Sequence, residues 1–490
     1  MRCKPVVFIA LCAICSFILS GCGSTASQST SGTQTSTPGG SNSGSASGST
    51  QPGAGSGSSG STGGSGSTAG SGSGNGTAGG GTAAGSASGS GSGTPQPGWT
   101  ESNSLLAFAG QVRAADFNGD GRQDLLVFGS GLEVLLNTGS GNFSALSTSA
   151  LPSGATAISQ VALTDLNGDG FIDVAACAVG NNGATGSASV YLNDHSGKLV
   201  LGQVIPLPAP CKGLAAGDAN RDGKVDLAIA YYTGSFTAPA SQIATWFGDG
   251  TGQFANPATQ AVTLTFAQEA DRNPCSIAAA TGADFDGDST LDLLVFGSCQ
   301  QGSAATTGNI YLAHGDGTGH YSLTKLTEAY TSASQTAAPY IKDVNGDGKP
   351  DVVYVQEQTG PHDSDATDID YAVNNGSNFT LVRTVSASSY ASNGNFITAG
   401  SPLNGPGTAI EGFRTESVSA TPATYGVSLF NDVNGSASQT WIYGQSTTSS
   451  SPGVVQGIAS ADFDGNGMQD FAVAETDSNH VATLHVYLHH

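Results

Sequence analysis

Six short segments of the chain place acidic or amide side chains at alternate positions, a spacing suited to holding a cation. The pattern Asp-x-[Asn/Asp]-x-[Asp/Asn]-x-x-x-Asp begins at Asp116, Asp165, Asp218, Asp284, Asp343 and Asp462. Side-chain oxygens at positions one, three, five and nine, with a backbone carbonyl at position seven, can surround one hard cation, and Gly at position six allows the sharp turn. Oxygen ligands in this number favour Ca²⁺ over Mg²⁺, whereas a transition metal would call for His or Cys.

The predicted ligands occupy the same positions in every loop. Side-chain ligands are Asp116, Asn118, Asp120 and Asp124; Asp165, Asn167, Asp169 and Asp173; Asp218, Asn220, Asp222 and Asp226; Asp284, Asp286, Asp288 and Asp292; Asp343, Asn345, Asp347 and Asp351; and Asp462, Asp464, Asn466 and Asp470. Backbone oxygens come from Arg122, Phe171, Lys224, Thr290, Lys349 and Met468. Ser289 replaces the position-six Gly and Asn466 replaces an Asp, so we expect weaker binding in those two loops. The alternative is a set of Asx turns that need no ion.

The spacing of the loops indicates a repeated unit with one loop missing. Their starts are separated by 49, 53, 66, 59 and 119 residues, so the last gap is about twice the others. The segment SPLNGPGTAI, residues 401–410, lies in the middle of that gap. It keeps Asn404 and the glycines but has Pro402, Pro406 and Ile410 where the loops have acids. We therefore expect seven repeats and about six Ca²⁺ sites, with none in the sixth repeat.

Each acidic loop lies between two short apolar stretches, such as residues 112–115 and 125–128, which predict a strand, a turn and a second strand. A further hairpin follows, as in EVLLNTGSGNFSAL and SVYLNDHSGKLVLG. Four strands per repeat predict a blade, and radial repetition of blades leaves only short strand edges. The expected fold is all-β: a seven-bladed β-propeller of four-stranded antiparallel blades over residues 99–490. Because the last repeat supplies only three strands, we expect residues 99–108 to complete it.

These repeats resemble the FG-GAP-like or VCBS repeats, whose units form the seven-bladed propeller of integrin α-chain heads. The motif D-x-N-G-D-G-x-x-D recurs at blade spacing, and the resemblance covers about residues 99–490. It implies calcium in the first hairpin of each blade and a binding role for the opposite face. On that face we expect long connectors at residues 231–242, 254–274 and 356–369. The candidate contact residues within these connectors are Tyr231, Tyr232, Phe236, Arg272 and His362.

The N-terminal residues predict export and a lipid anchor. A basic start and an apolar run lead to Leu-Ser-Gly-Cys at residues 19–22, which resembles the lipobox of bacterial lipoproteins. We expect residues 1–21 to be a signal peptide and Cys22 to be lipidated; the alternative is an ordinary secretory signal cut elsewhere. Gly23 after the Cys favours the outer membrane or cell surface. Residues 22–98 are almost wholly Gly, Ser, Thr and Ala and predict a disordered Gly/Ser-rich linker, because they cannot bury a core.

Charge and cysteine content limit the partners and the compartment. The formal charge is −23 with only 14 Lys and Arg residues, so nucleic acid is excluded as a partner class. In an exported protein the remaining cysteines are expected to form disulfides. We predict a Cys275–Cys299 bridge around the fourth loop and a Cys177–Cys211 bridge between the second and third blades. The alternative is four buried thiols, since Cys also packs as a small apolar residue.

No motif for catalysis is found: there is no H-E-x-x-H, P-loop or paired C-x-x-C. An acidic cluster at residues 361–370 is interpreted as a solvated loop, with an additional cation or ligand site as the alternative. The sequence thus favours a monomeric, non-enzymatic, lipid-anchored propeller that is stabilised by calcium and binds protein or glycan. Two other functions stay open, because a fold does not determine activity: a propeller enzyme acting on polysaccharide, and a structural subunit of an envelope complex.

Overall fold

The computed structural model has an all-β fold. It describes residues 98–180, 185–235, 238–264, 275–300, 306–329, 339–360, 363–376, 378–386, 397–399, 409–418, 423–433, 436–447, 454–476 and 481–490. The chain divides into two units, Met1–Ser88 and Gly89–His490, and all described residues belong to the second. The predicted signal peptide, Cys22 and the predicted linker up to residue 97 lie outside the described residues. Within the described part of the chain, no helix is long and apolar enough to cross a membrane.

The described strands form sheets in which most neighbours are antiparallel and consecutive in the chain; the exceptions are β1 beside β28 and the parallel pair β10 and β14. The first two four-stranded sheets are β2 (Gln111–Ala115), β3 (Asp124–Phe128), β4 (Leu132–Gly139) and β5 (Asn142–Ser149), then β6 (Ala155–Thr164), β7 (Asp173–Gly180), β8 (Gly186–Asn193) and β9 (Leu199–Leu207). Two further sheets are β18 (Tyr340–Lys342), β19 (Asp351–Gly360), β20 (Asp363–Asn374) and β21 (Phe379–Ser386), then β22 (Ile397–Ala399), β23 (Ala409–Val418), β24 (Ala423–Val433) and β25 (Ser436–Thr447). A fifth consists of β1 (Trp99–Leu105), β28 (Ala482–His489), β27 (Asp470–Thr476) and β26 (Val454–Ala461).

One larger sheet contains eight strands, ordered β13-β12-β11-β10-β14-β15-β16-β17. Its antiparallel halves are β10 (Cys211–Gly217), β11 (Asp226–Ser235), β12 (Ala238–Gly248) and β13 (Phe254–Val262), and β14 (Ser276–Ala283), β15 (Asp292–Gln300), β16 (Thr306–Gly315) and β17 (Tyr321–Ala329). The halves meet at one parallel pair, Gly213 with Ala280. A Cβ on Gly213 would lie 2.5 Å from the Cβ of Ala280, so this close approach requires glycine.

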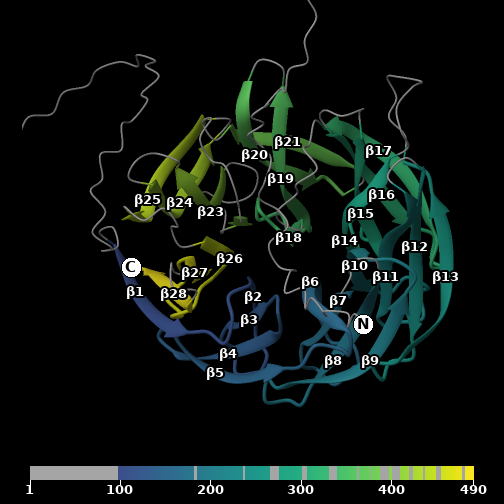
Figure 1. Ribbon diagram of the computed structural model, residues 1–490, viewed down its shortest axis with the longest axis horizontal. Coiled ribbons are helices and arrows are strands. Elements are labelled where there is room, and N and C mark those ends of the chain that lie inside the picture. Colours follow the sequence, from purple (N-terminus) through teal and green to yellow (C-terminus); the bar gives the residue numbers. More distant parts are fainter. Residues whose placement is uncertain are drawn as a thin grey trace, which may run out of the picture. The chain divides into compact units, whose positions relative to one another are not determined.

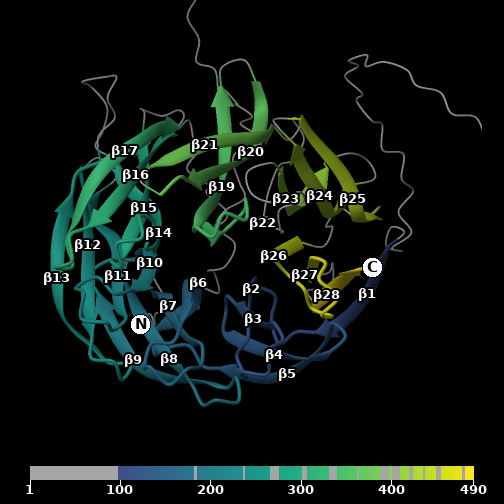
Figure 2. The same ribbon diagram turned by 180° about the vertical axis from the view of Figure 1, so that it is seen from behind.

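Successive sheets lie side by side in a propeller-like arrangement (Figures 1 and 2). Strand β10 contacts β6 and β7 on one side and β14 on the other, and β26 contacts both β22 and β2. The propeller-like fold expected from the sequence is thereby confirmed. The approach of β26 to β2 again needs glycine, because a Cβ on Gly457 would lie 2.6 Å from the Cα of Gln111.

The hydrophobic core lies between neighbouring groups of four strands: four of the clusters in the described residues combine side chains from two sheets, and one lies between the two halves of the eight-stranded sheet. Between the first two sheets, for example, Leu126 and Phe128 of β3 pack with Val174 and Ala176 of β7. Strand β3 is buried along its whole length, whereas the outer strand β5 alternates between exposed and partly buried residues. This explains the apolar runs in the second strand of each repeat, since a strand covered on both faces needs no polar alternation.

Three of the described cysteines are disulfide-bonded. Cys177 of β7 and Cys211 of β10 are bonded, with their Cα atoms 5.6 Å apart, and so connect the second and third repeats. This is the pair named from the sequence. Cys275 is also disulfide-bonded. The register of β14 and β15 pairs Ser276 with Ser298, which places Cys275 across from residue 299, but the Cys275–Cys299 bridge itself stays a prediction.

The long connectors expected from the sequence are mostly strands. Residues 231–242 belong to β11 and β12, which stay paired as far as Ser235 and Ala238. Residues 356–369 likewise fall largely in β19 and β20, paired as far as Gly360 and Asp363, and β13 covers the start of the third segment. Extending the hairpins satisfies backbone N–H and C=O groups that an irregular loop would leave to water. Residues 265–274 lie outside the described residues.

The N-terminal strand completes the last sheet, as predicted. β1 pairs with β28 from Trp99 opposite His489 to Leu105 opposite Thr483, so the strand ends three residues earlier than expected. The Trp99 ring stacks on His489 with 4.4 Å between ring centroids. A buried ionic cluster reinforces the same junction: His485 Nδ1 is 2.7 Å from Glu101 Oε1, and its Nε2 is 3.1 Å from Glu475 Oε1. Three strands, β1, β27 and β28, are therefore held by one imidazolium.

This cluster predicts a loss of stability at alkaline pH. Burial alone would lower the pKa of His485, but the hydrogen bonds and charges of Glu101 and Glu475 outweigh burial and raise the pKa to about 9. Because that value lies above the unfolded pKa of about 6.5, the contribution is fully present below pH 6.5 and is lost as the pH rises through 9. It amounts to about 3 kcal/mol. Thermal unfolding between pH 6.5 and 9.5 should show the wild-type Tm falling more steeply than that of Glu101→Gln.

The turn variant His320→Gln provides the control, because among the described residues the hydrogen bonds of His320 stay within its own turn: the ring contacts Thr318 Oγ1 and the backbone N–H donates to Asp316. It should keep the wild-type pH dependence. Equal slopes for Glu101→Gln and wild type would show that the cluster does not stabilise the junction.

Candidate metal centre

The acidic loops connect the first and second strands of their sheets in the same way. In each, the ninth residue is the first residue of the second strand: Asp124 of β3, Asp173 of β7, Asp226 of β11, Asp292 of β15, Asp351 of β19 and Asp470 of β27. The loop of the sixth repeat, including Asn404, lies outside the described residues. There β23 begins at Ala409, one residue before the Ile410 that corresponds to the ninth position.

The first-position acid folds each loop around its own carboxylate. Asp116 accepts backbone N–H groups from Gly119 at 2.7 Å, Asp120 at 3.2 Å and Gly121 at 2.8 Å. The same three bonds, from residues three, four and five positions later, are made to Asp165, Asp218, Asp284, Asp343 and Asp462. Gly119 and Gly121 have φ of +73° and +84°, so the turn depends on left-handed backbone.

Positions three, five and seven are connected within the loop. Asn118 Nδ2 donates to Asp120 Oδ2 at 3.0 Å, and the N–H of Arg122 donates to Asp120 Oδ1 at 2.9 Å. The seventh residues Phe171, Lys224, Thr290, Lys349 and Met468 donate their N–H groups in the same manner. The fifth-position oxygens are therefore oriented by the backbone of the residue whose carbonyl the sequence predicts as a ligand.

The ninth-position acid has a second role that the sequence did not reveal. Asp124 is fully buried; its Oδ2 accepts the N–H of Phe117 at 2.9 Å and its Oδ1 accepts the N–H of Asn137 at 2.7 Å. The other five ninth-position acids make the equivalent pair of bonds, to the loop and to the end of the third strand. This carboxylate thus fixes the loop to the sheet, whether or not it also binds a cation.

The electrostatics of the fifth and ninth positions differ. Burial raises the pKa of the ninth-position acids, to about 6 for Asp470, although two backbone donors oppose the shift. At the fifth position slight burial is outweighed by hydrogen bonds and a nearby cation, so the pKa values of Asp120, Asp169, Asp288 and Asp347 are lowered. These four fifth-position carboxylates are therefore ionised at neutral pH.

Basic side chains accompany these ionised acids. Arg122 pairs with Asp120 at 2.5 Å, Lys349 with Asp347 at 3.1 Å, and His195 with Asp169 at 2.9 Å. Arg221 of the third loop crosses to the fourth, where its Nη2 lies 2.6 Å from Asp288 and its Nε donates to Thr290 at 2.8 Å. Each of these pairs is partly exposed and so contributes little stability by itself.

Carboxylates converge closely enough to hold a cation in two of the loops. In the fourth, ligand atoms of Asp284, Asp286 and Asp288 lie within 4.8 Å of one another, and in the last those of Asp462, Asp464 and Asp470 do so. A histidine of β16 lies beside the fourth loop, with His314 Nδ1 at 3.5 Å from Asp286 Oδ2 and 3.8 Å from Asp292 Oδ1. The predicted carboxylate ligands of these two loops are thus brought together, and His314 is a neighbour that the sequence analysis did not name.

Asparagine side chains connect three of the acidic loops to the next repeat. Asn193, at the end of β8, donates its Nδ2 to the Phe117 carbonyl of the preceding loop at 2.7 Å. Asn374 and Asn137 make the same contact with Phe285 and Phe463. The sequence contained a signal for this, because the third strands end in Leu-Asn, Leu-Asn and Val-Asn in these repeats.

The candidate ligand-face residues are less well placed than expected. Tyr231 is 5% exposed and its hydroxyl donates to Gln242 Oε1 at 2.9 Å, so this prediction of a surface contact was wrong: the ring belongs to the core between the second and third repeats. Tyr232 is half-buried, with the Lys212 ammonium 5.6 Å from its ring centroid. Phe236, Arg272 and His362 lie outside the described residues.

Fold and loops together define a class of protein, a propeller-like array of small antiparallel sheets with an acidic turn in the first hairpin. A family model described as the FG-GAP-like repeat matches residues 116–176, 165–229 and 284–354. Each match begins at the first-position acid of a loop. The chain therefore contains three matched FG-GAP-like repeats, as the motif resemblance predicted. A search of curated proteins found no match.

Solved structures show only distant similarity. The core factor of S. cerevisiae has a TM-score of 0.42 at 10% identity, over 79% of this chain and 60% of that chain. A mutant of the Synechocystis apocarotenoid oxygenase has a TM-score of 0.38 at 9% identity, over 79% of this chain and 89% of that one. A subtype N10 neuraminidase-like protein of A/little yellow-shouldered bat/Guatemala/060/2010 has a TM-score of 0.37 at 9% identity, over 69% of this chain and 96% of that one. At these values the three structures support no functional inference.

The replaced glycine of the fourth loop gives a direct test of the turn geometry. Ser289 has φ of +67°, a region that costs a non-glycine residue about 1 kcal/mol. Ser289→Gly should raise the Tm and also tighten Ca²⁺ binding at that loop, measured by calorimetric titration. Ser140→Gly is the matched control: Ser140 has φ of +52° in the β4–β5 turn, outside any acidic loop, so only the Tm should rise. Unchanged Ca²⁺ affinity in Ser289→Gly would contradict the idea that this turn limits binding.

Proposed function

We propose that residues 99–490 form a calcium-stabilised interaction module that binds a protein or glycan partner. The observation that carries the proposal is the recurrence of one loop geometry. Six loops at the same place in their repeats wrap the backbone around a first-position carboxylate and direct further oxygens to the surface. The same loop surface recurs from sheet to sheet. Such recurrence is typical of a module that presents loops for binding rather than of a protein with a single catalytic centre.

The residues fit Ca²⁺ better than other common cations. The donors are carboxylate, amide and backbone oxygens, and three carboxylates converge within 4.8 Å in the fourth and last loops. When bound, Ca²⁺ would supply the positive charge that such carboxylates need to lie together. The residues at positions one, three, five, seven and nine would hold it, and the nearby basic side chains would give up their contacts with the fifth position.

We further propose that the propeller has seven blades. The two antiparallel halves of the eight-stranded sheet each contain four strands and are joined at the single registered pair Gly213 and Ala280. Counting the halves separately gives a blade for each repeat inferred from the sequence. The sixth blade, with Pro402, Pro406 and Ile410 at ligand positions, would then be the one without an ion.

The cellular setting follows from the sequence. Lipidation at Cys22 and a linker over residues 22–98 would display a monomeric propeller at the outer membrane or cell surface. The absence of a catalytic motif from the sequence favours binding over turnover. A propeller enzyme acting on polysaccharide and a structural subunit of an envelope complex are the competing functions.

Removal of the cation should destabilise the protein. Chelation is expected to lower the Tm, and Ca²⁺ should restore it better than Mg²⁺, because a ligand that binds only the folded state stabilises it by mass action. Asp120→Asn should weaken Ca²⁺ binding at the first loop in calorimetric titration, as Asn466 is expected to do in the last loop. Asp194→Asn, at a turn acid outside the loops, should leave it unchanged. A Tm that is unchanged by chelation would refute the proposal that calcium stabilises the protein.

Partner binding is tested with the purified full-length chain. The affinity of a partner for the wild type is compared with its affinity for two variants. A severalfold loss of affinity with Tyr232→Ala, together with unchanged affinity for Leu146→Ala, would place the contact at the β11–β12 hairpin. Leu146 is a suitable control because it is an exposed apolar residue on β5. A glycan array combined with an assay for newly released reducing ends separates the functions: glycan cleavage would contradict a pure binding role.

A further inference from the structure

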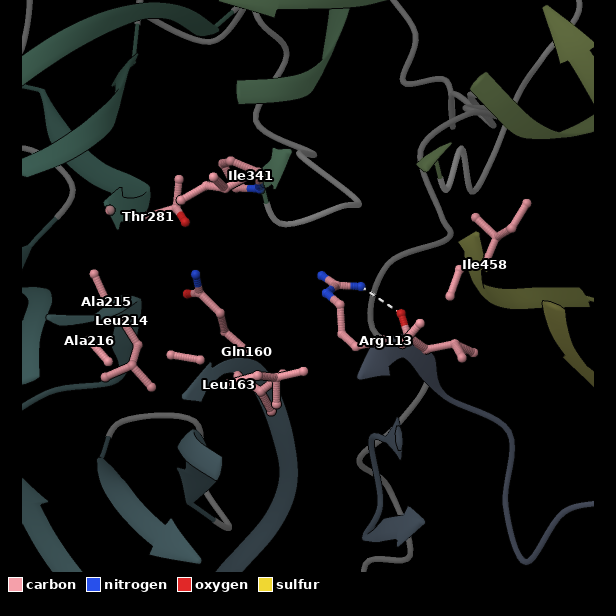
Figure 3. Close-up of a pocket in the computed structure, with 16 residues that line it drawn as sticks. Arg113, Gln160, Leu163, Leu214, Ala215, Ala216, Thr281, Ile341 and Ile458 are labelled. Atoms are coloured by element: carbon pink, nitrogen blue, oxygen red, sulfur yellow. Dashed lines mark hydrogen bonds between the residues drawn. The ribbon is translucent and has the colours of Figure 1, made fainter. Parts of the chain in front are cut away.

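A histidine and two carboxylates converge beside the fourth acidic loop. The Nδ1 of His314, on β16, lies 3.5 Å from Asp286 Oδ2 and 3.8 Å from Asp292 Oδ1. In the described part of the chain, no other histidine nitrogen is grouped with two carboxylates within 4.8 Å. The group is separate from the cavity among the first strands, whose lining includes Arg113 and Gln160 (Figure 3).

The position of His314 is apolar in the other five repeats that have an acidic loop. In the fourth repeat, Gly315 donates its N–H to the ninth-position acid, and His314 is the residue before this donor. The residues before the equivalent donors are Leu136, Leu192, Phe247, Val373 and Leu488. The fold therefore accepts an apolar side chain at this position, and the fourth repeat has a nitrogen ligand in its place.

The third position of the fourth loop differs in the same direction. It is the acid Asp286, whereas four of the other loops have an amide there, namely Asn118, Asn167, Asn220 and Asn345. The last loop also has an acid at this position, Asp464, but its repeat has Leu488 where the fourth has His314. Of the six acidic loops, only the fourth therefore combines a third-position carboxylate with an imidazole.

Arg221 of the third loop occupies the fifth-position acid of the fourth loop. Its Nη2 lies 2.6 Å from Asp288 Oδ2, and its Nε donates to Thr290 Oγ1 at 2.8 Å. The group of three carboxylates in this loop includes Asp288, so a cation bound there would have to displace the guanidinium. The group that contains His314 does not include Asp288, and it can therefore bind a cation while the contacts of Arg221 stay intact.

The ligand types and their spacing suit a divalent transition metal. Imidazole nitrogen and carboxylate oxygen bind Zn²⁺ at about 2.0–2.2 Å, and tetrahedral ligands at that distance lie roughly 3.3–3.6 Å apart. The two separations between the histidine and the carboxylates are close to this range. Asp292 Oδ1 already accepts the Gly315 N–H at 2.8 Å, but a carboxylate oxygen has a second lone pair. Ca²⁺ takes oxygen ligands and gains nothing from an imidazole.

We propose that the fourth loop is a site for a divalent transition metal such as Zn²⁺, held by His314 Nδ1 and by the carboxylates of Asp286 and Asp292. This metal is bound in preference to Ca²⁺, which occupies the loop only when no transition metal is present. The inference rests on the proposed function only in treating the loop as a cation site. The other five acidic loops have no such group of histidine and carboxylates among the described residues and keep Ca²⁺.

The test is calorimetric titration of the full-length protein with Zn²⁺ after removal of bound metal and with Ca²⁺ present in large excess. Wild type should still bind about one equivalent of Zn²⁺ tightly, because the imidazole favours Zn²⁺ over Ca²⁺. Co²⁺ in place of Zn²⁺ should give the visible absorption of a cobalt ion with nitrogen and oxygen ligands. No binding of Zn²⁺ to wild type in the presence of Ca²⁺ would overturn the proposal.

Variants locate the site without removing residues that the fold needs. His314→Leu and Asp286→Asn each introduce the residue that other acidic repeats have at the same position, so folding should be retained. Each should weaken Zn²⁺ binding at least about tenfold, since even changes to residues that only orient metal ligands cost about 10–100-fold. His195→Gln is the matched control: His195 Nε2 lies 2.9 Å from Asp169 Oδ2 of the second loop, but the two belong to no group of three ligands among the described residues.

The control should bind Zn²⁺ as wild type does. Unchanged Zn²⁺ binding in both His314→Leu and Asp286→Asn would show an adventitious ion only and refute the proposal. The calcium proposal fails separately. A Tm that depends on Ca²⁺, without Zn²⁺ binding that depends on His314, would refute only the transition-metal site. Zn²⁺ binding that depends on His314, with a Tm that Ca²⁺ does not change, would support this site and refute the calcium role.

Discussion

A buried carboxylate at the ninth loop position is the interaction on which each acidic repeat depends. In the first repeat, Asp124 joins the loop at Phe117 to the end of the third strand at Asn137 through its two oxygens. A carboxylate in this fully covered position would be costly without both donors, and each donor would in turn be a buried unpaired N–H without the carboxylate. The loop, the second strand and the third strand are thus mutually required. A cation would add to an arrangement that the backbone already forms.

This interdependence explains how much could be predicted from sequence. The alternating acids, the apolar runs around them and the interval between loops predicted an all-β array of hairpins, and the three-stranded end of the last repeat predicted that β1 would pair with β28. The same reasoning did not reveal the structural role of the ninth-position acid. Asp124 is where a ligand should be and also where a structural carboxylate must be, and residue type alone cannot separate two functions that require the same side chain at the same position.

Contacts between repeats could not be predicted from the sequence, for a different reason. The asparagine that ends β8 is visible, but its partner is the Phe117 carbonyl, and a backbone oxygen leaves no trace in residue type. The ion pair of Arg221 with Asp288 could not be predicted for the same reason, because only the fold brings the third loop beside the fourth. The extended β11–β12 hairpin has the same origin, since its small and polar residues suit a loop while its stability comes from backbone pairing.

The pairing of β1 with β28 has a consequence for biosynthesis. The hydrogen-bonded side chains of Thr100 and His490 are 390 positions apart, so one strand of the last sheet is made first and its partner is made much later. At typical synthesis rates of about 5–20 residues per second, that interval is roughly 20–80 s, and throughout it β1 has no place to dock. If the chain stayed extended until synthesis was complete, β1 would not pair with a wrong strand edge during that interval. The pairing of β1 with β28 would then form late, in a single step.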